Sequence, residues 1–174
     1  MTARVFFALW PPAPVARQLG AAAADFAGLA GGRATRPETI HLTLAFLGAV
    51  PVARLAELEL VAHTVRGAAF DLAIDRYGFW SHNRILWAGC SRTPAALGEL
   101  AGALAAALAA AGFLSAAAHR TFAPHVPLVR KVVQRDPLLP ACAPLIWPCR
   151  NFALVRSTLG SDGSSYRRLA ELAL

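Results

Sequence analysis

One short motif occurs twice in the sequence: a histidine followed by a strand-like stretch in which apolar residues alternate with others. His-Leu-Thr-Leu occupies residues 41–44 and His-Val-Pro-Leu occupies residues 125–128, so the histidines lie 84 residues apart (125 − 41), close to half of the 174-residue chain. This separation predicts a duplicated unit in which each copy brings one histidine to a shared cleft. Two imidazoles that face each other can act as acid and base on one phosphate.

The first unit has the order strand, helix, strand. Residues 4–9 form an almost continuously apolar run, typical of a strand covered on both faces. A helix is predicted from Pro14 to the Gly31-Gly32 break. A strand over 40–47, closed by Gly48, completes the unit. The apolar stripe of the helix, at spacings of three and four, consists of Val15, Leu19, Ala22, Phe26 and Leu29.

The second unit repeats this order. Residues 85–88 form an apolar strand, and an alanine-rich helix follows, which Thr93 can cap and Pro94 can start. Gly112 suits the end of this helix, after which the chain enters the strand of His125. The buried stripe of the helix is predicted to be Leu97, Leu100, Leu104 and Leu108.

The shared order of strand, helix and strand in the two units predicts an α+β fold with two pseudo-symmetric strand-helix-strand lobes. Their antiparallel sheets are expected to face a central cleft, with the helices outside. No linker in the sequence is long enough to separate two independent domains. We therefore expect residues 1–174 to form a single bilobal domain, an internal duplication with copies centred on His41 and His125.

Further elements are predicted between and after the two units. They are a helix over 52–66, a half-exposed strand over 70–74, and a strand after Asn151 that leads into a glycine-rich loop over 160–165. A strand region also carries the aromatic residues Tyr77, Phe79 and Trp80. These side chains either stack on a nucleic-acid base or belong to the core, and the sequence leaves both interpretations open.

Alanine accounts for much of an unusually apolar composition. Hydrophobic residues make up 56% of the chain and its mean hydropathy is +0.47, but alanine favours helices more than it anchors a membrane. Residues 95–113 approach membrane-spanning length, yet they contain Glu99 and several glycines. We expect a buried helix there and a cytoplasmic, monomeric protein without membrane attachment. The three cysteines show no metal-ligand spacing and are expected to be reduced.

The chain is strongly basic, with a formal net charge of +7. Every basic residue except Lys131 is arginine, and Arg33 and Arg36 lie in the loop before the first histidine strand. Arginine presents a planar fork of donors that can hold a phosphate through two hydrogen bonds, which favours an anionic partner, nucleic acid first. The compositional bias that enriches alanine also enriches arginine, so the charge alone does not require a ligand.

Side chains two apart in a strand point to the same face, so His41 and Thr43 project together. An imidazole beside a hydroxyl can transfer a proton and contact a phosphoryl oxygen at once. In the second copy His125 and Pro127 occupy the corresponding face, with Arg130 just beyond. Because unperturbed histidines titrate near pH 6.5, we expect one ring neutral and one charged at physiological pH, as a base and an acid require.

Residues 41–48 closely resemble the first motif of the two-histidine phosphoesterases, specifically the bacterial and archaeal RNA 2′,3′-cyclic phosphodiesterases once called 2′-5′ RNA ligases. Residues 4–9 resemble the opening strand of that family, and residues 122–130 resemble its second motif. The resemblance covers nearly the whole chain in order. It implies a bilobal α+β fold with an open cleft and hydrolysis of a terminal 2′,3′-cyclic phosphate to a 2′-phosphate.

The resemblance also implies roles for particular residues. His41 is the proton donor to the departing 3′ oxygen, and His125 is the proton acceptor that activates water. Thr43 and Arg130 hold phosphate oxygens. No metal and no cofactor is implied, and the partners are RNA ends or cyclic nucleotides. The residues alone do not assign donor and acceptor, because the two copies look alike.

Pro127 departs from the family pattern, in which the second motif reads His-x-Thr. Proline offers neither a hydroxyl nor a backbone N–H, and inside a strand it fits best at an edge or a bulge. Arg130, Ser161 or Ser164 are candidates to replace the missing contact.

Two other functions therefore stay open beside cyclic phosphodiester hydrolysis. One is 2′-5′ RNA ligase or phosphodiesterase activity, because reversal of ring opening uses the same acid and base. The other is a catalytically weakened RNA-binding module. A zinc site at the two histidines lacks further close ligands, and His63, His82 and His119 are expected at the surface.

Overall fold

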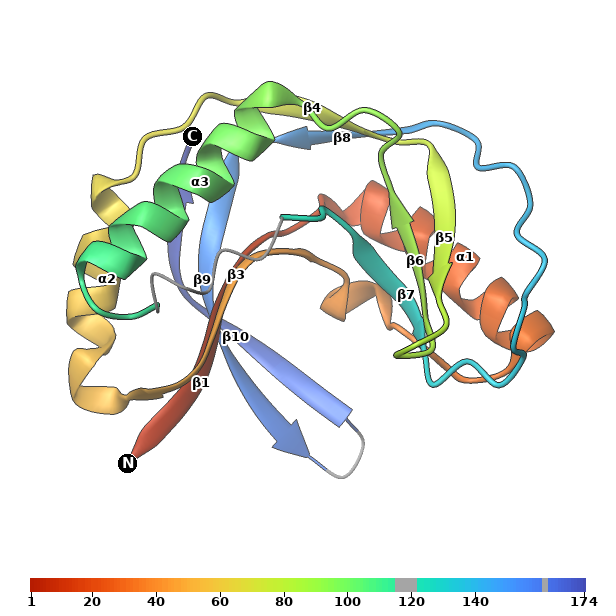
Figure 1. The fold of residues 1–174 in the computed structure, drawn as a ribbon, viewed down its shortest axis with the longest axis horizontal. Coiled ribbons are helices and arrows are strands. Elements are labelled where there is room, and N and C mark those ends of the chain that lie inside the picture. The colour runs from red at the N-terminus through yellow and green to blue at the C-terminus, as the bar shows by residue number, and fades with distance from the viewer. Residues whose placement is uncertain (115–121, 161–162) are drawn as a thin grey trace.

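The computed structural model describes residues 1–114, 122–160 and 163–174, which contain both strands and helices (Figure 1). The helical elements are α1 (Ala13–Ala30), α2 (Leu55–Thr64) and α3 (Ala95–Ala110), with short 3-10 turns η1 (Pro37–Thr39) and η2 (Val52–Arg54). The strands are β1 (Thr2–Leu9), β2 (Arg33–Ala34), β3 (Leu42–Pro51), β4 (Phe70–Ile74), β5 (Arg76–Trp80), β6 (Ile85–Gly89), β7 (Val126–Arg130), β8 (Leu145–Cys149), β9 (Asn151–Gly160) and β10 (Gly163–Ala173).

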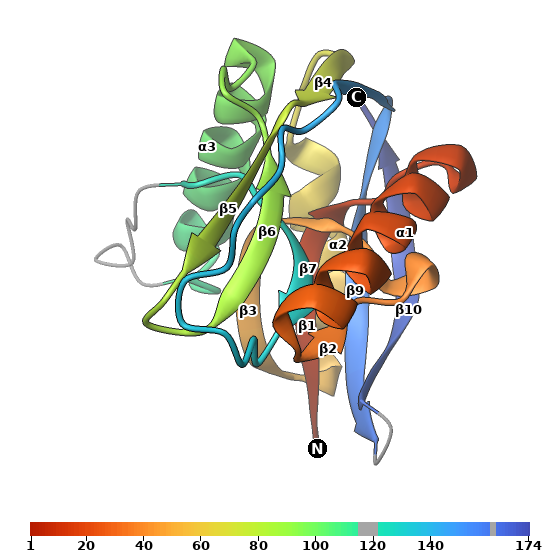
Figure 2. The same ribbon diagram turned by 90° about the vertical axis from the view of Figure 1, so that its right-hand side faces the viewer.

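Two four-stranded antiparallel sheets form the body of the protein. The first sheet has the strand order β10-β9-β1-β3, and the second has the order β2-β7-β6-β5. The helices lie on the outer sides of these sheets, with α2 and α3 beside the first and α1 beside the second (Figures 1 and 2). The predicted α+β fold is confirmed. Within the described ranges, no helix has the length and apolar character needed to cross a membrane.

Two helices, α1 and α3, each pack against the sheet that does not contain the strand before them. α1 follows β1 of the first sheet, yet it packs on β7 and β2 of the second. α3 connects β6 to β7 within the second sheet, yet it packs on β3 of the first and on α2. One cluster of buried apolar side chains consequently contains residues of both sheets and all three α-helices.

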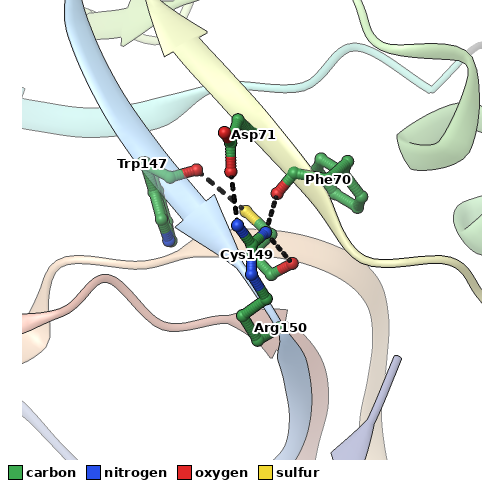
Figure 3. Close-up of polar contacts among 5 residues, drawn as sticks. All are labelled: Phe70, Asp71, Trp147, Cys149 and Arg150. Atoms are coloured by element: carbon green, nitrogen blue, oxygen red, sulfur yellow. Dashed lines mark hydrogen bonds and ion pairs between the residues drawn. The ribbon is translucent and has the colours of Figure 1, made fainter.

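The two-stranded sheet of β4 and β8 joins the lobes. β4 carries the chain from α2 to the second sheet, and β8 carries it back to the first. Arg150, which follows β8, donates hydrogen bonds to the Asp71 carboxylate and to the Phe70 carbonyl, both at 2.8 Å (Figure 3). The two crossings between the lobes therefore pair with each other.

The strands that follow the two histidines share an irregularity. The pairing of β3 with β1 skips Leu44, and the pairing of β7 with β6 skips Leu128, so each bulge falls three residues after its histidine. A bulge reverses the alternation of side chains, which is why Pro127 and Arg130 face the same pocket. The expectation that Pro127 lies at a bulge or an edge is confirmed, because a bulge tolerates a missing backbone N–H.

The helices differ from the predictions in detail. Leu29 is 77% exposed, whereas Ala30 is buried. A helix turns about 100° per residue, so the face that carries Leu19, Ala23 and Phe26 includes Ala30 and leaves Leu29 outside it. Pro94 has an extended backbone and occupies the N-cap of α3, so Thr93 does not cap this helix. The predicted leucine stripe of α3 is fully buried.

Three strand predictions need correction. β3 does not end at Gly48, because Gly48 adopts φ 73° and permits a second bulge, after which the strand continues to Pro51. The predicted loop over 160–165 belongs to a hairpin, with β10 starting at Gly163. β8 was not predicted, because prolines surround and interrupt its sequence and its strand character depends on pairing with β4.

We predict that Leu104→Ala destabilises the protein by about 2–5 kcal/mol, the usual effect of truncating a fully buried leucine. Chemical denaturation measures the free energy of unfolding. Leu60→Ala, at a side chain that is 69% exposed on α2, is the matched control and should change it by less than about 0.5 kcal/mol. Equal effects of the two substitutions would contradict the shared core described above.

Candidate active site

The two histidines have the same local structure. Each lies immediately before its strand, His41 before β3 and His125 before β7. The Nδ1 atom of His41 is 2.7 Å from the carbonyl oxygen of Thr39, and that of His125 is 2.8 Å from the carbonyl oxygen of Ala123, in both cases two residues earlier. A carbonyl only accepts, so each Nδ1 carries a proton. In the neutral rings, each Nε2 is therefore free to accept a proton.

Aromatic side chains in the first sheet and directly after its strand β1 enclose His41. The ring of Trp10 stacks on the imidazole at 5.2 Å and 15°, and the rings of Phe6 and Tyr166 lie 4.9 Å and 5.1 Å away. The histidine is only 7% exposed. Its position is therefore set on three sides by packing as well as by the hydrogen bond to Thr39.

His125 has a more open environment. Its ring meets the edge of Trp80 at 4.5 Å, and the residue is only partly buried. Tyr77 and Phe79 point to the opposite face of β5 and pack on the core, where Tyr77 meets Phe26 of α1. The core interpretation is thus confirmed for Tyr77 and Phe79, whereas Trp80 lies beside His125 and its stacking on a base stays a prediction.

Both imidazoles are easier to deprotonate than a free histidine. Burial lowers the pKa of His41 to about 4, and the positive charges of Arg130 and His125 add to this effect. Burial also lowers the pKa of His125, again with help from Arg130. The expectation of one charged ring is therefore wrong for the ligand-free protein, in which both rings are neutral at pH 7. A bound anion would favour protonation by offsetting the charge of Arg130.

A pocket of about 490 Å³ lies between the sheets beside His41. Of the four predicted site residues, His41, Thr43 and Arg130 line this pocket. Pro127 lines it as well. His125 does not belong to the lining, but it is near enough for its charge to lower the pKa of His41. The arrangement can hold an anion against Thr43 and Arg130 and move protons at Nε2 of a histidine.

Several lining residues were not singled out as site residues from the sequence. Arg33 and Arg36 reach the pocket from the loop before His41, and their sequence context marks them only as basic loop residues. Three further polar or charged lining residues come from β1, β9 and β10, and the pairing of these strands with one another and of β1 with β3 brings them to the pocket. They are Arg4, Ser157 and Tyr166. Ser164 of β10, a candidate from the sequence, also lines the pocket, whereas Ser161 lies outside the described residues.

Among the described residues, two further histidines and the three cysteines do not line this pocket. His63 and His82 are exposed, as expected, and His119 lies outside the described residues. Cys90, Cys142 and Cys149 carry free thiols. In the part of the chain that the structure describes, no three His, Cys, Asp or Glu side chains gather in a way that could hold a metal ion.

Comparison with known proteins places this geometry among phosphoesterases. The family described as LigT like Phosphoesterase matches residues 9–87, which include His41 and Thr43. The chain is 30% identical over 171 residues to the RNA 2′,3′-cyclic phosphodiesterase of Escherichia coli (strain K12), covering 98% of this chain and 96% of that protein. It is 27% identical to the protein of the same name from Thermus thermophilus, covering 98% and 90%.

A solved structure extends the similarity to three dimensions. The crystal structure of E. coli LigT complexed with 3′-AMP superposes with a TM-score of 0.90 at 30% sequence identity, covering 100% of this chain and 99% of the other. The likeness therefore includes both sheets and both histidine strands.

The low pKa of His41 predicts a pH-dependent stability. Between pH 6.5 and 4 the unfolded chain binds the proton that the folded protein excludes, so stability is full above pH 6.5 and falls as the pH drops. From pH 7 to pH 5 the free energy of unfolding should fall by about 2 kcal/mol more in the wild type than in His41→Gln. Urea denaturation at both pH values measures this difference. His63→Gln, at an exposed site, is the control, and an equal loss in all three proteins would refute the assignment.

Proposed function

We propose that this chain, which belongs to the LigT-like phosphoesterase family, hydrolyses the terminal 2′,3′-cyclic phosphate of RNA to a 2′-phosphomonoester. The observation that carries the proposal is the pair of equivalent histidines, each with Nδ1 tied to a carbonyl and Nε2 free, beside a pocket with Thr43 and Arg130. The names of the relatives support RNA ends with a 2′,3′-cyclic phosphate as the substrate class, and small cyclic nucleotides are a second candidate.

In the proposed mechanism, His125 is the proton acceptor and His41 the proton donor. Nε2 of His125 takes a proton from water as the water oxygen bonds to phosphorus. The bond from phosphorus to the 3′ oxygen breaks, and Nε2 of His41 protonates that oxygen. Because both rings are neutral in the free protein, His41 takes up its proton when the anionic phosphate binds. The assignment of the donor role to His41 and of the acceptor role to His125 is based on family resemblance.

Thr43 and Arg130 are proposed to hold the phosphate oxygens. The hydroxyl of Thr43 and the guanidinium of Arg130 enter the pocket from opposite sheets. Arg130 balances the phosphate charge and the imidazoles transfer the protons, so the proposed reaction needs no metal. Pro127 stands where a second hydroxyl would lie, and Ser164 lines the same pocket as a candidate replacement.

The shared bulges and the shared histidine contacts also support the proposal that residues 1–174 form one bilobal domain built from two copies, centred on His41 and His125. Ligation or cleavage of 2′-5′ linkages would use the same acid and base in the same pocket. Analysis of the reaction products separates this alternative from hydrolysis.

We predict that His41→Ala and His125→Ala each lower kcat by about a hundredfold or more, since each removes one positioned proton transfer. The assay follows 2′-phosphomonoester release from an oligonucleotide that ends in a 2′,3′-cyclic phosphate, in the presence of EDTA. His63→Ala, on the exposed side of α2, should keep the wild-type rate. A wild-type rate in either pocket variant would refute the mechanism, and failure of the wild type in EDTA would refute metal independence.

Pro127→Thr should raise kcat/KM by about tenfold, because a hydrogen bond to a charged group contributes about 1.5–3 kcal/mol. Thr43→Val removes the equivalent contact from the first sheet and should lower kcat/KM by a similar factor. Thr64→Val, at an exposed helix end, is the control. If Pro127→Thr leaves kcat/KM unchanged while Thr43→Val lowers it, the second sheet does not contact the phosphate through position 127.

If the protein is instead a weakened RNA-binding module, the wild type binds RNA in a salt-sensitive manner but releases no phosphomonoester at any pH from 5 to 9. The observation that favours this candidate is Pro127 at the second motif.

A further inference from the structure

Arg33 and Arg130 form an unusual pair at the edge of the second sheet. They are direct partners in the pairing of β2 with β7, and both line the pocket. Like charges directly opposite each other across a sheet are destabilising. Among the described residues, no carboxylate makes an ion pair with Arg33 or Arg130, whereas Arg36 is paired with Glu38 at 3.2 Å. Anions bound in the pocket would offset this repulsion.

The guanidinium of Arg33 extends toward the first sheet. A β-carbon built on Gly163 would lie 3.1 Å from Nη1 of Arg33, so this group rests against the start of β10. Arg4 enters the pocket from β1, with its guanidinium 4.8 Å from the centre of the Phe46 ring. Arginine side chains from both sheets thus line the pocket.

The proposed reaction uses one phosphate, held by Thr43 and Arg130. Arg33 and Arg4 have no part in that contact. The pocket, about 490 Å³ in volume, is also lined by residues of both sheets and has room for more of a nucleotide than the reacting phosphate. Both the charge and the space exceed what the reacting group needs.

We propose that Arg33, together with Arg4, binds a second phosphate, the one on the 5′ side of the terminal nucleotide. This inference rests on the proposed function and specifies its substrate. The preferred substrate carries a 5′-linked phosphate, either the phosphodiester that joins the terminal nucleotide to RNA or a 5′-phosphate on a single nucleotide. A nucleoside 2′,3′-cyclic phosphate, which has only the reacting phosphate, is the poorer substrate.

Turnover of three substrates tests the proposal. They are adenosine 2′,3′-cyclic phosphate, the same nucleotide with a 5′-phosphate, and an adenosine dinucleotide that ends in the same cyclic phosphate. The second phosphate should raise kcat/KM by about tenfold or more in the wild type. Arg33→Gln should bring this ratio close to one, while Arg17→Gln, an exposed arginine of α1 outside the pocket, should keep it. Equal kcat/KM values for the three substrates, or an unchanged ratio in Arg33→Gln, would overturn the inference.

A binding experiment separates this inference from the proposed function. Calorimetry compares adenosine 3′,5′-bisphosphate with adenosine 3′-phosphate, and neither measurement needs turnover. Tighter binding of the bisphosphate by about tenfold, lost in Arg33→Gln and kept in Arg17→Gln, supports the second-phosphate site even if the wild type hydrolyses nothing. Equal binding of the two nucleotides argues against the site even if cyclic phosphates are hydrolysed. The dinucleotide and the 5′-phosphate distinguish an RNA end from a single nucleotide.

Discussion

The hydrophobic core shared by the two halves of the chain holds the active site together. Because α1 packs on the second sheet and α3 packs on the first, neither lobe can bury its own apolar face alone. The pairing of β4 with β8 adds a second connection where the chain crosses between the lobes. The separation of His41 and His125 is therefore set by packing of buried side chains and not by a linker.

Within this frame, the two copies agree in backbone and differ in environment. Each histidine donates Nδ1–H to a carbonyl two residues earlier, and each following strand has a bulge at the same position. His41, however, is enclosed by Trp10, Phe6 and Tyr166, whereas His125 meets Trp80 in a more open place. Burial lowers the pKa of both imidazoles, and it does so to about 4 at the more enclosed His41.

Local patterns in the sequence predicted much of the fold. The leucine stripe of α3 and the strands that contain the two histidine motifs depend on short-range periodicity, and the structure has them where they were expected. Thr43 and Arg130 follow their histidines closely in the sequence, so we could predict from the sequence that they lie near those histidines. Tyr166 and Arg4 were not predicted, because Arg4 reaches the pocket through the pairing of β1 with β3, and Tyr166 through the pairing of β1 with β9 and of β9 with β10.

The sequence by itself determined the two histidine motifs, from which acid-base chemistry is predicted, and it determined most of the strands and helices, because side-chain periodicity is a local property. The tertiary structure decided the charge state of those histidines, because the loss of solvent that lowers their pKa comes from strands distant along the chain. It also decided that Arg33 and Arg130 face one pocket, since the pairing of β2 with β7 joins segments on opposite sides of the chain's midpoint.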